Sequence, residues 1–200
     1  MKLKVCGMKY PENIAELVKL PIDWMGLIFH EQSPRFVGDL DAAFLQTIPS
    51  SIRLTGVFVN KSKEYILDKV EKYRLKTVQL HGSESPVLCK ELKSSGVEVI
   101  KAFQVENPDD LRECVFYETA CDYFLFDTKT LQYGGSGKKF DWKILSAYSC
   151  ETPFFLSGGI DLEDIETIKR LKMKQIHAID INSKFEIAPG IKDINKIKMI

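Results

Sequence analysis

Two short apolar runs of this chain each end on a side chain that can exchange a proton. The run from Leu3 ends on the thiol of Cys6, and the run from Tyr123 ends on the carboxyl group of Asp127. A thiol becomes a base when nearby cations or N–H dipoles favour the thiolate, and a partly desolvated carboxyl group keeps its proton near neutral pH. An isomerase must remove one proton and supply another, so we expect these two residues to be the base and acid of one pocket.

The alternative for the thiol is a purely structural role. Free cysteine is among the residue types that are most often buried in protein cores. Its position at the end of a strand-like run, directly before Gly7, favours the functional interpretation of Cys6.

A pair of glycines gives the strongest local signal in the chain. Gly158 and Gly159 follow the apolar run that ends at Leu156. Adjacent glycines let the backbone approach an anion closely, and the N–H groups of a following helical turn can receive it. Together with Asn182 and Ser183, which follow the last apolar run, they predict a phosphate site. A tight turn that needs positive φ is the alternative interpretation.

Three further polar residues could contact a ligand. Arg35 could hold a carboxylate through two parallel hydrogen bonds, or it could be a solvated surface arginine. His81 and Asp180 both lie at the end of an apolar run, and a structural, hydrogen-bonded histidine is the alternative for His81. No HxH or HExxH motif and no carboxylate cluster appears, so we expect no metal site.

The segment 133–139 is rich in glycine but does not fit the Walker pattern of a nucleotide-binding loop. A glycine-rich loop beside a candidate acid is typical of a lid that closes over substrate. A flexible connection without function is the alternative.

These candidates all follow strand-like segments, which recur along the whole chain at spacings of about 22 to 30 residues. Near-continuous apolar runs of this length are expected of parallel strands that are covered on both faces. The predicted strands are Leu3–Cys6, Met25–Phe29, Leu54–Val59, Thr77–Leu80, Val97–Phe103, Tyr123–Phe126, Pro153–Leu156 and Ile176–Ile181.

Helical patterns occupy the intervals between these strands, and several of them begin at a Ser, Asp, Asn or Pro residue that favours a helix start. The predicted helices are Ile14–Leu20, Ala42–Ile48, Tyr65–Tyr73, Val87–Leu92, Leu111–Tyr117, Trp142–Tyr148, Leu162–Leu171 and Ile194–Met199. Eight strands alternating with eight helices predict an α/β fold, a single (β/α)₈ barrel spanning residues 1–200. A doubly wound open sheet is the rival, but the first turn lacks its GxGxxG pattern.

The composition narrows the class of protein further. The 200 residues carry a formal net charge of zero and no block of like charge, which argues against nucleic-acid or membrane-surface partners. No stretch reads as a signal peptide or as a membrane span. The five scattered cysteines show no CxxC spacing, so we expect reduced thiols in a cytoplasmic protein.

The ordered set of these motifs resembles the phosphoribosylanthranilate isomerase family of tryptophan biosynthesis from end to end. The segments that carry the resemblance are Lys4-Val5-Cys6-Gly7, Ser33-Pro34-Arg35-Phe36-Val37, Gly56-Val57-Phe58-Val59-Asn60, Val78-Gln79-Leu80-His81-Gly82, Phe126-Asp127-Thr128, Gly134-Gly135-Ser136-Gly137-Lys138, Ser157-Gly158-Gly159-Ile160 and Pro189-Gly190-Ile191-Lys192-Asp193.

The resemblance implies an Amadori rearrangement of N-(5-phosphoribosyl)anthranilate to a 1-deoxyribulose 5-phosphate, with no metal or cofactor. Asp127 would then protonate the furanose ring oxygen, and Cys6 would take the C2 proton. Arg35 would hold the anthranilate carboxylate. The phosphate would bind at Gly158, Gly159, Asn182 and Ser183, with Asp180 nearby. The protein would act on a phosphorylated small molecule as a monomer or a homodimer.

One departure from the family pattern falls in the predicted phosphate site. Lys184 stands where a glycine is usual, which puts the local backbone of that loop in question. Two other functions stay open on the residues alone. One is a different phosphate-binding barrel enzyme, such as a sugar-phosphate epimerase or a lyase. The other is a non-enzymatic ligand-binding or thiol-sensing domain.

Overall fold

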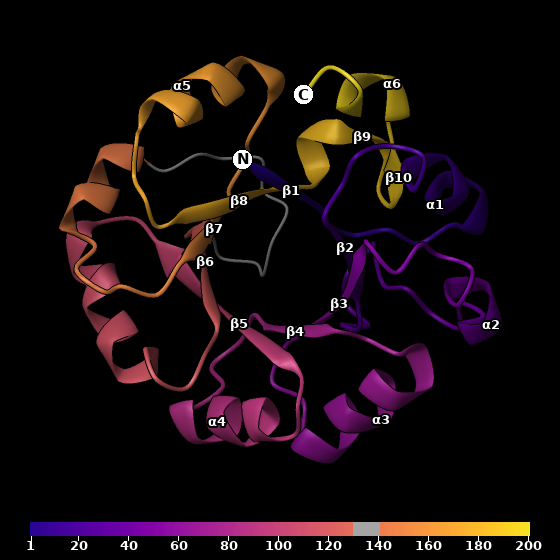
Figure 1. Ribbon diagram of the computed structural model, residues 1–200, viewed down its shortest axis with the longest axis horizontal. Coiled ribbons are helices and arrows are strands. Elements are labelled where there is room, and N and C mark those ends of the chain that lie inside the picture. The colour runs from indigo at the N-terminus through magenta and orange to yellow at the C-terminus, as the bar shows by residue number, and fades with distance from the viewer. Residues whose placement is uncertain (130–140) are drawn as a thin grey trace.

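Strands β1 to β8 close into a parallel barrel in chain order, and the last strand pairs with the first (Figure 1). The computed structural model describes residues 1–129 and 141–200. The predicted (β/α)₈ fold is confirmed in this described part. The strands are β1 (Lys2–Val5), β2 (Trp24–Ile28), β3 (Arg53–Phe58), β4 (Thr77–Leu80), β5 (Glu98–Val105), β6 (Tyr123–Thr128), β7 (Phe154–Leu156) and β8 (Ile176–Ile181).

Helical segments surround the ring of strands (Figure 1). Several begin where the sequence offers a capping side chain. Ser62 accepts a hydrogen bond from the Tyr65 N–H, and Ser85 accepts one from the Leu88 N–H. The α-helices are α1 (Pro11–Leu17), α2 (Ala42–Leu45), α3 (Lys63–Tyr73), α4 (Pro86–Ser94), α5 (Ile165–Arg170) and α6 (Ile194–Ile197).

Two predicted helices form as 3₁₀ helices, at Pro108–Tyr117 and Trp142–Ala147. A third prediction, Leu162–Leu171, divides into a 3₁₀ turn over Leu162–Asp164 followed by α5. The start of the first segment was predicted correctly, because Asn107 forms a capping box with Asp110. Its later part is rich in β-branched and aromatic residues, which favour the α-helix only weakly.

A short antiparallel hairpin after β8 was not predicted. It consists of β9 (Glu186–Ala188) and β10 (Ile191–Lys192), joined through Gly190 at a φ of +84°. The 3₁₀ turn Ser183–Phe185 leads into it. The hairpin matters for the site because it carries two buried charged side chains, which are described below.

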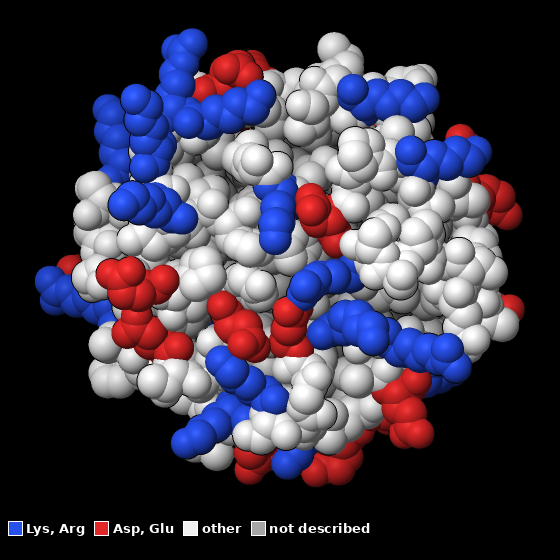
Figure 2. All heavy atoms as spheres, viewed as in Figure 1, with Lys and Arg blue, Asp and Glu red and all other residues white. Residues whose placement is uncertain are grey.

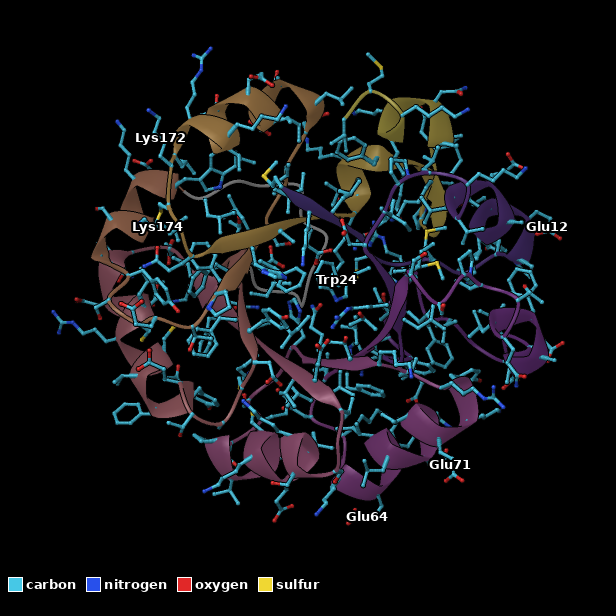
Figure 3. All side chains as sticks on the ribbon, viewed as in Figure 1. Glu12, Trp24, Glu64, Glu71, Lys172 and Lys174 are labelled. Carbon is cyan, nitrogen blue, oxygen red and sulfur yellow. The ribbon has the colours of Figure 1, made fainter. Side chains whose placement is uncertain are left out.

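Apolar side chains form two separate clusters. The larger one fills the space between the strands and the helices. The smaller one lies inside the barrel and consists of Trp24, Ile100, Ala102, Leu125, Phe155 and Ala178. Figure 3 labels Trp24 within the ring of strands. Because Trp24 begins β2, this plug closes the barrel toward the starts of the strands and leaves the other end for polar groups.

Charged side chains of both signs lie on the face of the molecule that Figure 2 shows, in keeping with the zero net charge of the chain. In the described residues, no helix combines the length and the apolarity that a bilayer crossing requires.

The inner plug generates a prediction about stability, because it contacts His177. The His177 ring lies 5.3 Å from the Trp24 ring and 4.6 Å from the Tyr123 ring, centroid to centroid. Burial lowers the pKa of this imidazole, and the charges of Lys2 and Arg53 lower it further. The unfolded chain therefore binds a proton at His177 at a higher pH than the folded chain does.

We expect the free energy of unfolding to fall as the pH drops below about 6.5, the ordinary histidine value, until the lower folded-state pKa is passed. His177→Gln should reduce this fall, whereas His30→Gln should leave it in place. Urea unfolding of the three proteins between pH 7.5 and pH 5.5 measures the effect. An equal loss of stability in the wild type and in His177→Gln would contradict it.

Candidate active site

An open cleft lies at the C-terminal ends of the barrel strands, and it holds about 740 Å³ of space when the open solvent at its mouth is included. This is the end at which active sites of such barrels form. Its wall brings together eight of the nine residues that the sequence singled out: Cys6, His81, Asp127, Gly158, Gly159, Asp180, Asn182 and Ser183. Arg35 is the exception, because its side chain does not line the wall.

Cys6 follows β1 directly, and its N–H donates to the Ile181 carbonyl at 2.9 Å, which extends the pairing with β8. The thiol is 5% exposed and faces the cavity. It packs against Gly26 so closely that a Cβ there would lie 2.6 Å from Sγ. Burial raises the pKa of the Cys6 thiol, while the positive charges of Lys4 and Lys192 act in the opposite direction.

The ammonium group of Lys4 is fully buried beside this thiol. Its Nζ donates to Gln79 Oε1 at 2.7 Å and to Asp180 Oδ2 at 2.9 Å. Lys4 and Asp180 are register partners on β1 and β8, so barrel closure itself sets their pairing. Burial lowers the pKa of the Lys4 ammonium, but the charges of Asp180 and Cys6 outweigh it and raise the pKa overall. The lysine is therefore held as a cation.

Asp127 lies on β6 and presents its carboxyl group to the same cavity. Oδ1 accepts a hydrogen bond from the Thr128 N–H at 2.8 Å, and Oδ2 lies 3.5 Å from His81 Nε2. The sequence placed Cys6 and Asp127 on two distant strands, and the structure puts both on one cavity wall.

The glycine pair follows β7, as predicted, and both residues have positive φ, at +93° for Gly158 and +64° for Gly159. A Cβ on Gly158 would lie 2.4 Å from Thr128 Oγ1 and 3.2 Å from Asp127 Oδ1. Glycine is thus required there by backbone conformation and by space. The tight turn is thus present at the predicted phosphate site, and it packs directly against the carboxyl group of Asp127.

The backbone at Lys184 does not require the glycine that is usual at this position. Among the described non-glycine residues, positive φ occurs only at Asn60, Arg74 and Lys172. Lys184 lies in the 3₁₀ turn Ser183–Phe185, which an L-residue adopts without strain. Its side chain lines the cavity beside Asn182 and Ser183 and so adds a cation to the predicted phosphate site.

Arg35 is not a solvated surface residue. It is 9% exposed, and its Nε and Nη2 atoms bind the Glu186 carboxylate at 2.6 to 3.0 Å. Gly7, at a φ of +76°, leaves room for Arg35 and Asn182, since a Cβ on Gly7 would lie 2.8 Å from Arg35 Cδ and 2.8 Å from Asn182 Oδ1. Among the described residues, no hydrogen-bond partner occupies Nη1, which leaves donors for a ligand carboxylate.

A second buried lysine supports this side of the site. Lys192 of the hairpin donates to Asn182 Oδ1 at 2.7 Å and to Glu186 Oε1 at 2.6 Å. Burial raises the pKa of the Glu186 carboxyl, but hydrogen bonds from Arg35 and Lys192 outweigh it and lower the pKa overall. Glu186 thus joins Arg35 to the loop that carries Asn182.

The sequence analysis assigned no role to four of these residues: Lys4, Gln79, Glu186 and Lys192. The signal for Lys4 and Gln79 was present, because each is a polar residue within a short apolar strand. Lys192 and Glu186 gave no such signal, since both lie in a hairpin that was not predicted. The glycine-rich segment proposed as a lid lies outside the described residues. Within the described residues, no group of three or more His, Cys, Asp or Glu side chains could hold a metal ion.

The position of Lys4 predicts how the thiol reacts. Lys4→Met removes the nearest cation and leaves the Asp180 carboxylate beside Cys6, so the thiol should ionise only at a higher pH. The rate of Cys6 alkylation by iodoacetamide, measured against pH, should shift toward alkaline values. Cys6→Ala gives the background rate from the other thiols.

Lys101→Met is the matched control, because Lys101 is equally buried but binds Glu84 and the Gly82 carbonyl instead. Removing one partner of a buried ion pair destabilises a protein by roughly 3–5 kcal/mol. The double variant Lys4→Met/Asp180→Asn therefore repeats the test without an unpaired carboxylate. An unchanged alkylation profile in both Lys4 variants would refute the role of this cation.

The sequence matches a known protein family and its members over nearly its whole length. A family model described as N-(5'phosphoribosyl)anthranilate (PRA) isomerase matches residues 3–200. The N-(5'-phosphoribosyl)anthranilate isomerase of Parabacteroides distasonis is 46% identical over 200 residues, which cover 99% of this chain and 90% of that relative.

Solved structures agree over the whole chain. The phosphoribosyl anthranilate isomerase of Thermotoga maritima matches with a TM-score of 0.87 and 34% identity, covering 100% of this chain and 96% of that chain. A complex of such an isomerase with reduced 1-(o-carboxyphenylamino)-1-deoxyribulose 5-phosphate gives a TM-score of 0.84 at 30% identity and covers 100% and 95%. Monomers generated from the dimeric Thermotoga maritima enzyme match with a TM-score of 0.82, again at 30% identity and with coverages of 100% and 95%.

Proposed function

The chain belongs to the N-(5'-phosphoribosyl)anthranilate isomerase family, and from that premise we propose how its own residues carry out the reaction. The protein catalyses the isomerase step of tryptophan biosynthesis that acts on N-(5'-phosphoribosyl)anthranilate. One observation carries the proposal: a thiol, a carboxyl group and the glycine pair after β7 line the same cavity. A sugar-phosphate epimerase or lyase and a thiol-sensing domain are set aside on this membership.

The proposed sequence begins at Asp127. Its carboxyl group gives a proton to the furanose ring oxygen, and the C1–O bond breaks to leave an open-chain Schiff base. The contact with the Thr128 N–H then stabilises the carboxylate that remains, because an N–H donor favours the charged form. A desolvated site strengthens this interaction, since the cavity lies within the barrel end.

Cys6 acts second in the proposed mechanism. Its thiolate takes the proton from C2 and yields an enolamine, which tautomerises to the ketone. Burial raises the pKa of the Cys6 thiol, which makes the thiolate costly to form. The ammonium group of Lys4 offsets part of this cost, which is why the mechanism depends on a buried cation beside the base.

The two ends of the substrate are held away from the reacting carbons. The phosphate binds at Gly158, Gly159, Asn182 and Ser183. Lys184 adds a positive charge at the same place. Arg35 lies against Gly7 outside the cavity wall, and its proposed role requires the donors that Glu186 leaves free to reach the anthranilate carboxylate of the bound substrate. Asp180 and His81 face the cavity between these ends. Anchoring both ends of the substrate orients C2 between the base and the acid. This lowers the reaction barrier, because the entropy of orientation is already lost when the substrate binds.

We therefore propose a phosphorylated small molecule as the ligand. We also propose that the protein is a monomer or a homodimer, as the sequence suggested. Its relative from Thermotoga maritima is described as dimeric. We also propose that residues 1–200 form a single catalytic domain that works in the cytoplasm.

Asp127→Asn tests the acid directly. The amide cannot donate the proton, so kcat should fall by about 10²-fold or more while the fold is retained. Substrate made in situ loses its fluorescence on conversion, which gives the rate. Asp68→Asn, on the exposed face of α3, is the matched control and should keep full activity. Activity within about twofold of wild type in Asp127→Asn would overturn the proposed role.

Lys184→Met tests the additional cation at the phosphate site. Exposed charge pairs contribute roughly 0.2–1 kcal/mol, so KM should rise about 1.4- to fivefold while kcat stays nearly constant. The effect should shrink at high salt, because the contact is solvent-exposed and screened. Lys198→Met removes an exposed lysine from the C-terminal end as a control. A fall in kcat with KM unchanged would contradict a binding role for Lys184.

A further inference from the structure

Gln79 connects Lys4, which lies beside the proposed base, with His81, which lies beside the proposed acid. The side chain is 1% exposed and lies on β4, inside the barrel end. Its Oε1 lies 2.7 Å from Lys4 Nζ, and its Nε2 lies 2.8 Å from His81 Nδ1. Lys4 neighbours Cys6, and His81 Nε2 lies 3.5 Å from Asp127 Oδ2. One amide therefore spans the interval between the two reactive residues.

The orientation of this amide follows from the chemistry of its partners. A lysine ammonium group can only donate hydrogen bonds, so the amide oxygen must face Lys4. The NH₂ group then faces His81 Nδ1 and can only donate to it. Nδ1 must therefore carry a lone pair, and the proton of the neutral imidazole lies on Nε2.

The Nε2 proton is directed at the acid. Nε2 is buried and, among the described residues, has no hydrogen-bond partner in this state. Its nearest charged neighbour is Asp127 Oδ2, at a distance that is too long for a strong hydrogen bond. A shift of a few tenths of an ångström would complete the bond once Asp127 has lost its proton, because a carboxylate accepts at both oxygens.

We propose that Gln79 is a positioning residue that fixes the Nε2–H tautomer of His81 toward Asp127 while it holds Lys4 beside Cys6. The proposal rests on the proposed roles of Cys6 and Asp127. The tautomer itself is a property of the free protein, so it can be measured without any assay of turnover. An amide suits this position because its two terminal atoms offer an acceptor to the lysine and a donor to the histidine at the same time.

Gln79→Glu is the sharpest test, because it keeps the shape and replaces the only donor by an acceptor. One carboxylate oxygen can still bind Lys4, but the other can only accept from His81, which must then carry a proton on Nδ1. Long-range ¹H–¹⁵N NMR spectra distinguish the two tautomers directly. The chain has three histidines, and His30→Gln and His177→Gln assign their signals.

We expect Nε2–H at His81 in the wild type and a proton on Nδ1 in Gln79→Glu. We also expect kcat to fall by at least roughly tenfold in Gln79→Glu and in Gln79→Met, with KM within about twofold. Gln175→Met makes the same chemical change just before β8, at the other end of the barrel, and should alter neither quantity. Backbone amide spectra establish that each variant is folded.

Nδ1–H at His81 in the wild type would overturn the proposal, and so would an unchanged tautomer in folded Gln79→Glu. Wild-type kcat in folded Gln79→Met would also overturn it. If Asp127→Asn kept full activity while His81 showed the expected tautomers, the role of the acid would fail and the function of Gln79 in setting the tautomer would stand.

Discussion

The buried ammonium group of Lys4 is the interaction on which the rest of this site depends. An isolated charge inside a protein costs several kcal/mol, so it persists only with close partners of opposite charge or polarity. Asp180 supplies the charge, and Gln79 supplies a second acceptor from the far side of the barrel. Because these residues come from β8, β1 and β4, the cation is satisfied only when the barrel has closed. Closure of the fold and assembly of the site are therefore one event.

The interior of the barrel is divided between two kinds of packing. Toward the starts of the strands, the cluster around Trp24 and Phe155 fills the space with aromatic and aliphatic side chains. Toward the ends of the strands, the interior is filled by hydrogen-bonded polar side chains, which are those of Lys4, Gln79 and Asp180. The apolar half can be packed for stability, and the polar half can be arranged around the reacting groups. Gly7 at positive φ then leaves room for Arg35 beside the backbone that follows Cys6, and Gly158 lets the glycine turn pack against Asp127.

Much of this arrangement was predictable from the sequence, because one rule governs parallel barrels. Residues that follow apolar strands meet at one end, so Cys6, Asp127 and the glycine pair could be placed in one pocket without knowledge of any contact. Arg35 was singled out from its residue type, and the family resemblance added the anthranilate carboxylate as its expected ligand, but neither supplied its partner Glu186. The strand boundaries were also predicted well, since the predicted ends fall within about two residues of the observed ones.

The polar network could not be predicted for a physical reason. The β1 and β4 sequences alternate polar and apolar residues, so Lys4 and Gln79 can be assigned to the face opposite their apolar neighbours, but nothing in the sequence says which side chains they contact there. Their contact also depends on the stagger of β1 against β4, which is set by the closed ring. The β9–β10 hairpin was missed because its strands are short. Helices were predicted where two 3₁₀ helices form, but their 3₁₀ type was not, because capping signals mark the start of a helix without fixing its type.

We propose above all that Cys6 and Asp127 act on one carbon chain from opposite sides while the phosphate lies against the glycine pair. A crystal structure of this protein with the reduced deoxyribulose phosphate analogue is the sharpest test. We expect Cys6 Sγ near C2 and the Asp127 carboxyl group near the O4 hydroxyl, with the phosphate on the N–H groups around Gly158 and Gly159. An analogue bound with its phosphate elsewhere, or with the thiol and the carboxyl group both remote from its carbon chain, would overturn this mechanism.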